Sequence, residues 1–156
     1  SRRYYHDVVG CNSRLDTIQA VVLDIKLTHL DEYATARRAA ADFYDQAFRG
    51  NDKIRVPARA PWSLHVFHQY TLVLEGIDRD ALSQYLAEKG IPSMIYYPVP
   101  GHRQKMFEQS GIPAKEMPVT DWLTSRVISL PIHTELDQEQ LEYITRTILG
   151  FVNNNK

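Results

Sequence analysis

The chain has 156 residues, of which 44% are hydrophobic and 24% are charged, and its formal net charge at pH 7 is −1. This length suits one domain with a substantial hydrophobic core, and the dispersed, nearly balanced charge argues against nucleic acid or an anionic membrane surface as a partner. One cysteine excludes an internal disulfide, and without a signal-peptide pattern or a run of about 20 apolar residues we expect a soluble, cytoplasmic protein.

A compact polar loop near the start of the chain has the sequence GCNSRLDTIQA. Gly10 permits a tight turn, and Asn12 and Ser13 are short polar residues that cap helices well. Ser13 and Asp16 have the spacing of a capping box, so the pattern predicts a helix that begins near Arg14. The first turn of a helix offers free N–H groups, and such a loop could hold a phosphate. A plainly capped helix with an exposed Arg14 is the alternative.

One long helix is expected after this loop. Between about residue 14 and residue 48 there is no Pro or Gly, and apolar residues recur at helical spacing. At 1.5 Å per residue this helix would be roughly 50 Å long, which is more than a small domain needs, so we expect it to connect two bodies. Gly50 follows at a position typical of a helix C-terminus, and the proline-rich residues 57–61 predict a loop.

The rest of the chain has the pattern of a small α+β domain. Residues 64–74 alternate and are rich in β-branched and aromatic side chains, which predicts a strand. The order of elements predicts an α+β fold in which a long N-terminal helix precedes a three-stranded sheet with helices on one face. The other expected elements are helices over 78–89, 118–127 and 137–152, strands over 91–97 and 128–132, a loop over 108–117 and a disordered tail over 153–156.

The sequence holds no complete catalytic constellation. Cys11 lies near His6 in the sequence, but nothing there supplies an activated thiolate, so we interpret this cysteine as incidental. His65 and His68 are three residues apart on an expected strand and would point to opposite faces, which disfavours a shared metal site. We therefore expect no catalytic residue and no metal ligand in this chain.

Two adjacent tyrosines, Tyr96 and Tyr97, end the second expected strand just before a proline. Neighbouring side chains on a strand project in opposite directions, so one ring could face a pocket while the other packs against the protein. Packing of both amphipathic rings at a strand edge is the alternative that the residues leave open.

Several motifs in order resemble the DegT/DnrJ/EryC1/StrS family of pyridoxal-phosphate (PLP) sugar aminotransferases. They include Tyr5-His6, the G-x-N-S-R-L-D loop at Gly10, the Gly90-Ile91-Pro92 turn, Tyr97-Pro98-Val99-Pro100 and Ser129-Leu130-Pro131-Ile132. The resemblance covers the whole chain as the C-terminal part of such an enzyme, and the start at Ser1 also indicates a piece of something longer. It implies the C-terminal domain of a fold type I PLP-dependent transferase. The implied division is an active-site loop left from the large domain (1–15), a connecting helix (16–50), a small domain (51–152) and a tail (153–156).

The resemblance also implies roles for four residues. In this family an asparagine in the loop reaches the PLP phosphate of the neighbouring subunit, a role that would fall to Asn12. Arg14 matches the arginine beside the nucleotide-sugar site, where its planar fork could bind a diphosphate or carboxylate. Tyr96 and Tyr97 stand where many members carry His-Tyr and approach the sugar from the partner subunit. The match is direct at Tyr97 and departs at Tyr96, which leaves the sugar preference open.

The function implied for the whole enzyme is amination of a nucleotide-linked keto sugar, with glutamate as the amino donor, for surface polysaccharide synthesis. The aldimine lysine and most of the cofactor pocket belong to an N-terminal domain that this sequence lacks, so we expect this chain alone to be inactive and to bind PLP weakly or not at all. We expect a homodimer, and an apolar stripe on the first helix that is exposed or paired with another copy. A PLP-dependent sugar dehydratase of the same family, with histidine at the lysine position, and a non-catalytic α+β binding or assembly module are the alternatives.

Overall fold

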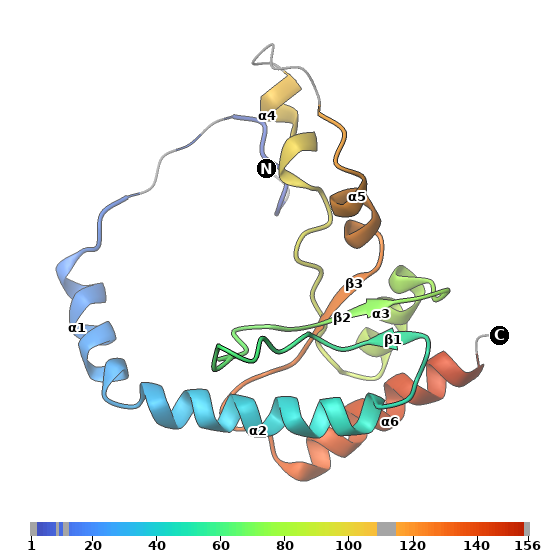
Figure 1. Cartoon of the computed structure of the whole chain (residues 1–156). Coiled ribbons are helices and arrows are strands. Elements are labelled where there is room, and N and C mark those ends of the chain that lie inside the picture. Colours follow the sequence, from blue (N-terminus) through green and yellow to red (C-terminus); the bar gives the residue numbers. More distant parts are fainter. Residues whose placement is uncertain (1–2, 9, 11–12, 109–114, 155–156) are drawn as a thin grey trace.

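The computed structural model describes residues 3–8, 10, 13–108 and 115–154 of the chain (Figure 1). It has an α+β fold, as predicted, with a small sheet covered by helices. The elements in chain order are α1 (Thr17–Leu27), α2 (Leu30–Phe48), β1 (Ile54–Arg55), β2 (Tyr70–Leu74), α3 (Arg79–Glu88), the 3-10 helix η1 (Gly101–Arg103), α4 (Lys105–Glu108), α5 (Pro118–Thr124), β3 (Val127–Leu130) and α6 (Gln138–Asn154).

Within the described residues the sheet has three antiparallel strands in the order β1-β2-β3. Tyr70 pairs with Leu130 and Leu72 with Ile128, so the start of β2 lies beside the end of β3. Burial alternates along β2, as expected for a strand with one face on the core. This register brings the segment before β2 and the segment after β3 to the same edge of the molecule.

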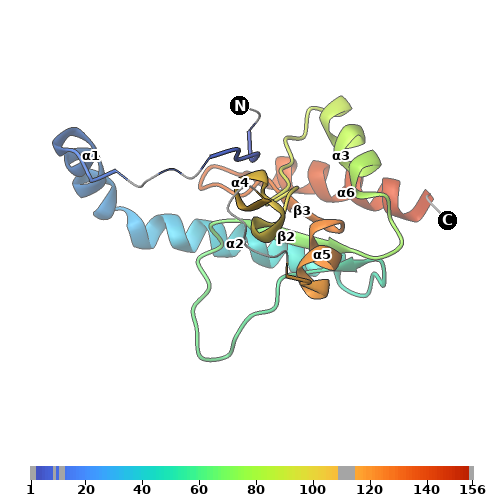
Figure 2. The ribbon, with the colours of Figure 1, turned by 90° about the horizontal axis from the view of Figure 1, so that it is seen from above.

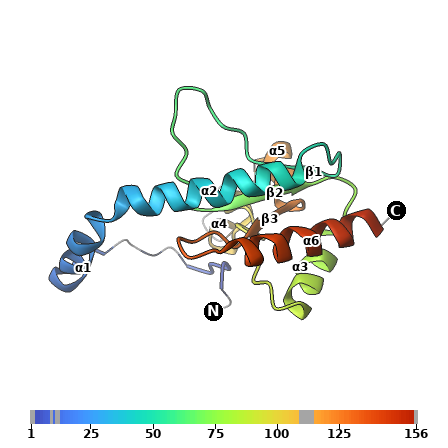
Figure 3. The same ribbon diagram turned by 90° about the horizontal axis from the view of Figure 1, so that it is seen from below.

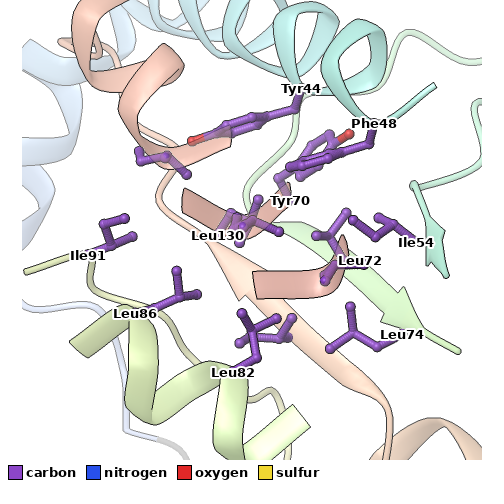
Figure 4. Close-up of a cluster of buried hydrophobic side chains, with 14 of the residues drawn as sticks. Tyr44, Phe48, Ile54, Tyr70, Leu72, Leu74, Leu82, Leu86, Ile91 and Leu130 are labelled. Carbon is purple, nitrogen blue, oxygen red and sulfur yellow. The ribbon is translucent and has the colours of Figure 1, made fainter. Parts of the chain in front are cut away.

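One hydrophobic core lies between the sheet and helices α2, α3 and α6 (Figure 4). Tyr44 and Phe48 enter it from α2, while Leu82 and Leu86 enter it from α3. Tyr44 keeps its hydroxyl paired by donating a hydrogen bond to the carbonyl oxygen of Pro131, at 2.9 Å. Because every polar atom that enters a core must find a partner, this bond also attaches the segment after β3 to α2.

The predicted long helix is two helices with a break at Thr28 and His29. The Thr28 hydroxyl donates to the carbonyl oxygen of Ile25 at 2.7 Å, a local bond of the kind that competes with helical hydrogen bonding. The predicted start was also wrong. Asp16 itself is the N-cap of α1, and its Oδ1 accepts from the backbone N–H of Gln19 at 2.8 Å.

Two strand predictions were too long. Only residues 70–74 of the stretch 64–74 are extended, because Phe67 has φ 46° and its N–H donates to Nδ1 of His65 at 2.9 Å instead of joining the sheet. The expected strand over 91–97 is reduced to one bridge between Met94 and Ser129. Pro92 and Pro98 flank that bridge and lack the N–H that a longer ladder would need. The third strand of the sheet is therefore the short strand β1, and not residues 91–97.

Helix boundaries in the second half of the chain agree closely with prediction. Asp78 caps α3 by accepting from the N–H groups of Asp80 and Ala81, and Gly90 follows with φ 73°. Pro118 occupies the first turn of α5, and α6 covers the expected range and continues through Asn154, into the stretch expected to be disordered. The sequence pattern missed α4, which ends at Glu108, where the expected 108–117 loop begins.

Candidate functional site

Three tyrosine rings from distant parts of the chain meet in one place. The ring centroid of Tyr4 lies 5.5 Å from that of Tyr97 and 6.1 Å from that of Tyr96, and the two adjacent rings are 5.8 Å apart. All three pairs are edge-to-face, the arrangement that the ring quadrupoles favour. We call these three residues the tyrosine cluster. Tyr4 was not singled out by the sequence, because no local pattern connects it with residues so far along the chain.

The two adjacent tyrosines differ in their surroundings, although both rings pack against Tyr4. Tyr96 is half-buried and lines a pocket of about 260 Å³, whereas Tyr97 is 57% exposed. Burial raises the pKa of the Tyr96 hydroxyl above its ordinary value, and the neighbouring Tyr4 raises it further. The Tyr96 phenol therefore stays protonated at neutral pH, where it can both donate and accept a hydrogen bond.

The pocket beside Tyr96 lies where the start of β2 and the end of β3 meet. Its lining residues are His68, Gln69, Pro92, Met94, Tyr96, Ser129, Leu130, Pro131, Ile132 and His133. A second pocket, of about 300 Å³, lies on the Tyr4 side of the cluster, and its lining residues are Arg3, Tyr4, Tyr5, Ser83, Ser93, Met94, Ile95 and Pro98. The tyrosine cluster thus has a hollow on each side, both mixed in polarity.

Arg37 of α2 holds the two outer walls of the Tyr96 pocket together. Its Nη1 donates to the carbonyl oxygens of Phe67 at 3.1 Å, His68 at 3.2 Å and Ile132 at 2.9 Å. One guanidinium therefore joins the segment before β2 to the segment after β3. A helix residue that acts on loop carbonyls leaves no sequence signal, and Arg37 was missed for that reason.

The other predicted site residues are not part of this cluster. Arg14 is exposed and precedes α1, and no hydrogen bond or ion pair among the described residues connects it with the tyrosine cluster. Helix α1 projects from the body of the molecule in all three ribbon views (Figures 1, 2 and 3). Asn12 and Cys11 lie outside the described residues. The roles of Asn12 and Arg14 thus remain predictions.

Helix α1 carries a continuous apolar surface. None of its residues is buried, and its apolar side chains face solvent: Ile18 is 80% exposed and Ile25 is 62% exposed. A shallow hollow of about 600 Å³ lies along α1 and the start of α2, with Leu15, Leu23, Leu27 and Leu30 among its lining residues. The expected exposed apolar stripe is confirmed. Exposed apolar area of this kind is typical of interaction surfaces.

The described residues include no group of three His, Cys, Asp or Glu side chains that could hold a metal ion. His65 accepts from Phe67 and stacks on its ring at 4.1 Å between centroids, while His68 lines the Tyr96 pocket. The two histidines therefore have separate surroundings. Among the described helices, none is both long enough and apolar enough to cross a membrane.

Comparison with known proteins decides the family. The model of the DegT/DnrJ/EryC1/StrS aminotransferase family matches residues 1–149. This chain belongs to the DegT/DnrJ/EryC1/StrS aminotransferase family. The resemblance inferred from the motifs is confirmed. Enzymes of this family use PLP as their cofactor.

The relatives of this family member are much longer proteins. A UDP-N-acetyl-3-dehydro-alpha-D-glucosamine 3-aminotransferase of Acidithiobacillus ferrooxidans is 44% identical over 145 residues, which is 93% of this chain and 38% of the relative. A dTDP-3-amino-3,6-dideoxy-alpha-D-galactopyranose transaminase of Aneurinibacillus thermoaerophilus is 33% identical over 94% of this chain and 39% of its own length. The crystal structure of DesV from S. venezuelae, in complex with a ketimine intermediate, superposes with a TM-score of 0.82, at 34% identity, over 99% of this chain and 41% of that one.

The two pockets beside the tyrosine cluster can be compared with what a PLP site needs. Neither pocket beside the tyrosine cluster is lined by a lysine that could bind the cofactor covalently or by a carboxylate that could pair with its ring nitrogen. These two pockets offer hydrogen-bonding and stacking groups to a ligand, and whether this chain alone binds PLP stays a prediction.

Proposed function

We propose that this chain is the C-terminal part of a PLP-dependent aminotransferase that converts the ketone of a nucleotide-linked sugar into an amine. Membership of the aminotransferase family over residues 1–149 carries this proposal. Two relatives that are named as aminotransferases or transaminases of UDP-linked and dTDP-linked sugars support it. Glutamate is the proposed amino donor, and surface polysaccharide synthesis in the cytoplasm is the proposed setting.

In this proposal the chain supplies contacts and the rest of the enzyme supplies the reaction. Tyr96 and Tyr97 contact the sugar, and the protonated phenol of Tyr96 can bond to a ring hydroxyl or to the keto oxygen. Arg14 pairs with the diphosphate of the nucleotide, and Asn12 with the cofactor phosphate of the neighbouring subunit. The enzyme is a homodimer, and α1 contributes to the apolar contacts that build it. The lack of any buried residue in α1 supports a covered position for this helix in the longer protein.

The proposal is tested on the longer protein encoded by the gene, side by side with this chain. Each is incubated with PLP and treated with borohydride, which reduces an imine between PLP and lysine to a stable bond. The protein is then digested, and the masses of the peptides are measured by mass spectrometry. An aminotransferase keeps PLP fixed to a lysine outside this chain, and this chain alone keeps none. PLP fixed to a lysine of this chain alone would contradict the division of roles. PLP that binds the longer protein but cannot be fixed would favour the dehydratase, and no binding at all would favour a non-catalytic module.

A further inference from the structure

Gln104 is a buried amide that joins two distant segments of the chain. It follows η1 and is 7% exposed. Its Oε1 accepts from the backbone N–H of His6 at 3.0 Å, and its Nε2 donates to the carbonyl oxygen of Tyr4 at 2.9 Å. The same nitrogen lies 3.4 Å from the carbonyl oxygen of Val99. Both the oxygen and the nitrogen of the amide are therefore hydrogen-bonded. Its partners come from the N-terminal segment and from the residues just before η1.

The segment that Gln104 holds also makes other contacts with the residues around α4, among them an ion pair of 3.7 Å between Lys105 Nζ and Asp7 Oδ1. Residues 3–8 run beside the segment that contains α4, as the ribbon views agree (Figures 1 and 3). One backbone bond adds to the amide, from the N–H of Met106 to the carbonyl oxygen of His6 at 3.1 Å. Among the described residues, the hydrophobic core contains none before Ala40. The segment therefore lies outside that core, and the hydrogen bonds of Gln104 are among the contacts that attach it to the rest of the molecule.

The position of the tyrosine cluster depends on this attachment. Tyr4 has φ 68°, and its carbonyl oxygen is bound by the amide while its ring meets Tyr96 and Tyr97. A side chain that grips the backbone of a residue also limits where the ring of that residue can go. Gln104 thus fixes one ring of the cluster through its backbone, without touching a ligand itself.

We infer that Gln104 is a positioning residue for the substrate face: it fixes Tyr4 against Tyr96 and Tyr97 and holds the N-terminal segment beside them. The link to substrate rests on the proposed function, in which those tyrosines contact the sugar. The attachment itself depends only on the contacts given above and can be tested on this chain without any ligand.

The test uses two variants of this chain and one control. Gln104→Met keeps the length of the side chain and removes both hydrogen bonds, whereas Gln104→Glu keeps an acceptor toward His6 and loses the donor toward Tyr4. Gln84→Met makes the same change at an exposed glutamine of α3 that bonds only to Glu88 among the described residues. Amide hydrogen exchange of His6 and nuclear Overhauser contacts between the Tyr4 and Tyr97 rings are the two readouts.

In Gln104→Met we expect the His6 amide to exchange about tenfold faster, the scale set by one lost hydrogen bond, and the ring contacts of Tyr4 to disappear. Gln104→Glu should lose the ring contacts as well, and Gln84→Met should change neither readout. The melting temperature should fall little in any variant, because the core does not include this segment. Unchanged exchange and ring contacts in Gln104→Met would overturn the inference. A large fall in the melting temperature of Gln104→Met would also overturn it, because that result would mean that Gln104 stabilises the whole fold and not one segment.

An error in the proposed function would give a different set of results from an error in the role of Gln104. If the longer protein neither binds PLP nor aminates a sugar while Gln104→Met still releases Tyr4, the attachment stands and the function is wrong. If the longer protein is an aminotransferase and its Gln104→Met variant has an unchanged KM for the nucleotide sugar, the role of Gln104 toward the substrate is wrong.

Discussion

The guanidinium of Arg37 donates a 2.9 Å hydrogen bond to the carbonyl oxygen of Ile132, and so ties the segment after β3 to α2. The same Nη1 lies within hydrogen-bonding distance of two carbonyl oxygens before β2. All three contacts are made by this one terminal nitrogen, so a single group of α2 joins the segment before β2 to the segment after β3. The shape of the Tyr96 pocket therefore depends on a residue that does not line it.

Replacing Arg37 by methionine should lower the free energy of unfolding by about 2 kcal/mol, because charge-assisted bonds are lost and partly buried carbonyls are left unpaired. Urea unfolding followed by circular dichroism measures the change. Arg38→Met is the matched control, since Arg38 bonds only to the exposed hydroxyl of Thr35 among the described residues, and it should cost less than about 0.5 kcal/mol. Equal losses in the two variants would contradict the assigned role of Arg37.

Stability should fall at alkaline pH because of two buried tyrosines. Burial raises the pKa values of Tyr44 and Tyr70 above their ordinary value, and the hydroxyl of Tyr70 also donates to Oδ1 of Asp45 at 2.6 Å. Below about pH 10 both phenols are protonated in the folded and the unfolded chain, so they add no pH dependence. Above that pH only the unfolded chain releases these protons, and stability should fall by about 1.4 kcal/mol per pH unit for each tyrosine.

Urea titrations between pH 9 and pH 11 test this expectation, with Tyr70→Phe as the variant. In this variant the free energy of unfolding should fall less steeply with rising pH, because one of the two buried phenols is gone. The variant should also be less stable at pH 7, because Asp45 loses a hydrogen-bond partner. Tyr143→Phe, at a partly exposed tyrosine of α6, is the matched control. Identical slopes in all three proteins would mean that the buried phenols do not control alkaline unfolding.

The sequence predicted those features that depend on neighbouring residues. Local pattern predicts the ends of α3 at Asp78 and Gly90. It also predicts the helix α6 and the strand β3. It could not predict the break at Thr28 and His29, because neither Gly nor Pro marks it and the competing hydroxyl bond is visible only in three dimensions. Strand 91–97 was over-predicted for a similar reason, since its residues suit a strand but have a partner only at Met94.

Of the residues in and around the tyrosine cluster, the sequence singled out only the two that a motif contains, and their role toward a sugar stays a prediction. Tyr96 and Tyr97 were found together because they are adjacent and match a family motif. Tyr4, Arg37 and Gln104 were missed, because each acts through tertiary contacts with residues that lie far away in the sequence. Tyr4 completes the cluster, and Arg37 and Gln104 hold the segments around it, so two of the chemical groups were predictable and their arrangement was not.

The apolar face of α1 should make this chain self-associate. We expect the apparent mass in light scattering to rise with concentration, and the double variant Ile18→Asp with Ile25→Asp to remain monomeric with an unchanged melting temperature, since neither residue is buried. Val119→Asp is the control, because Val119 is also exposed but belongs to α5. A clean monomer across a wide range of concentrations would count against a role for this face in assembly.

Tyr96→Phe in the longer protein should raise the KM for the nucleotide sugar by about five- to tenfold and change kcat little, because one hydrogen bond to the bound sugar is lost. Steady-state kinetics with saturating glutamate measure this. Tyr143→Phe, which removes a hydroxyl bound to the carbonyl oxygen of Lys89, is the control. An unchanged KM in Tyr96→Phe would remove this residue from the substrate site.

The most direct measurement is the transfer of nitrogen from ¹⁵N-glutamate to a nucleotide-linked keto sugar by the longer protein, followed by mass spectrometry. Because the names of the two relatives given above place the changed group at C3, UDP-linked and dTDP-linked 3-keto sugars are the substrates to use. We predict a ¹⁵N-amino sugar with the longer protein and none with this chain alone. A longer protein that transfers no nitrogen to either sugar, or that releases a dehydrated sugar without nitrogen, would contradict the proposed aminotransferase.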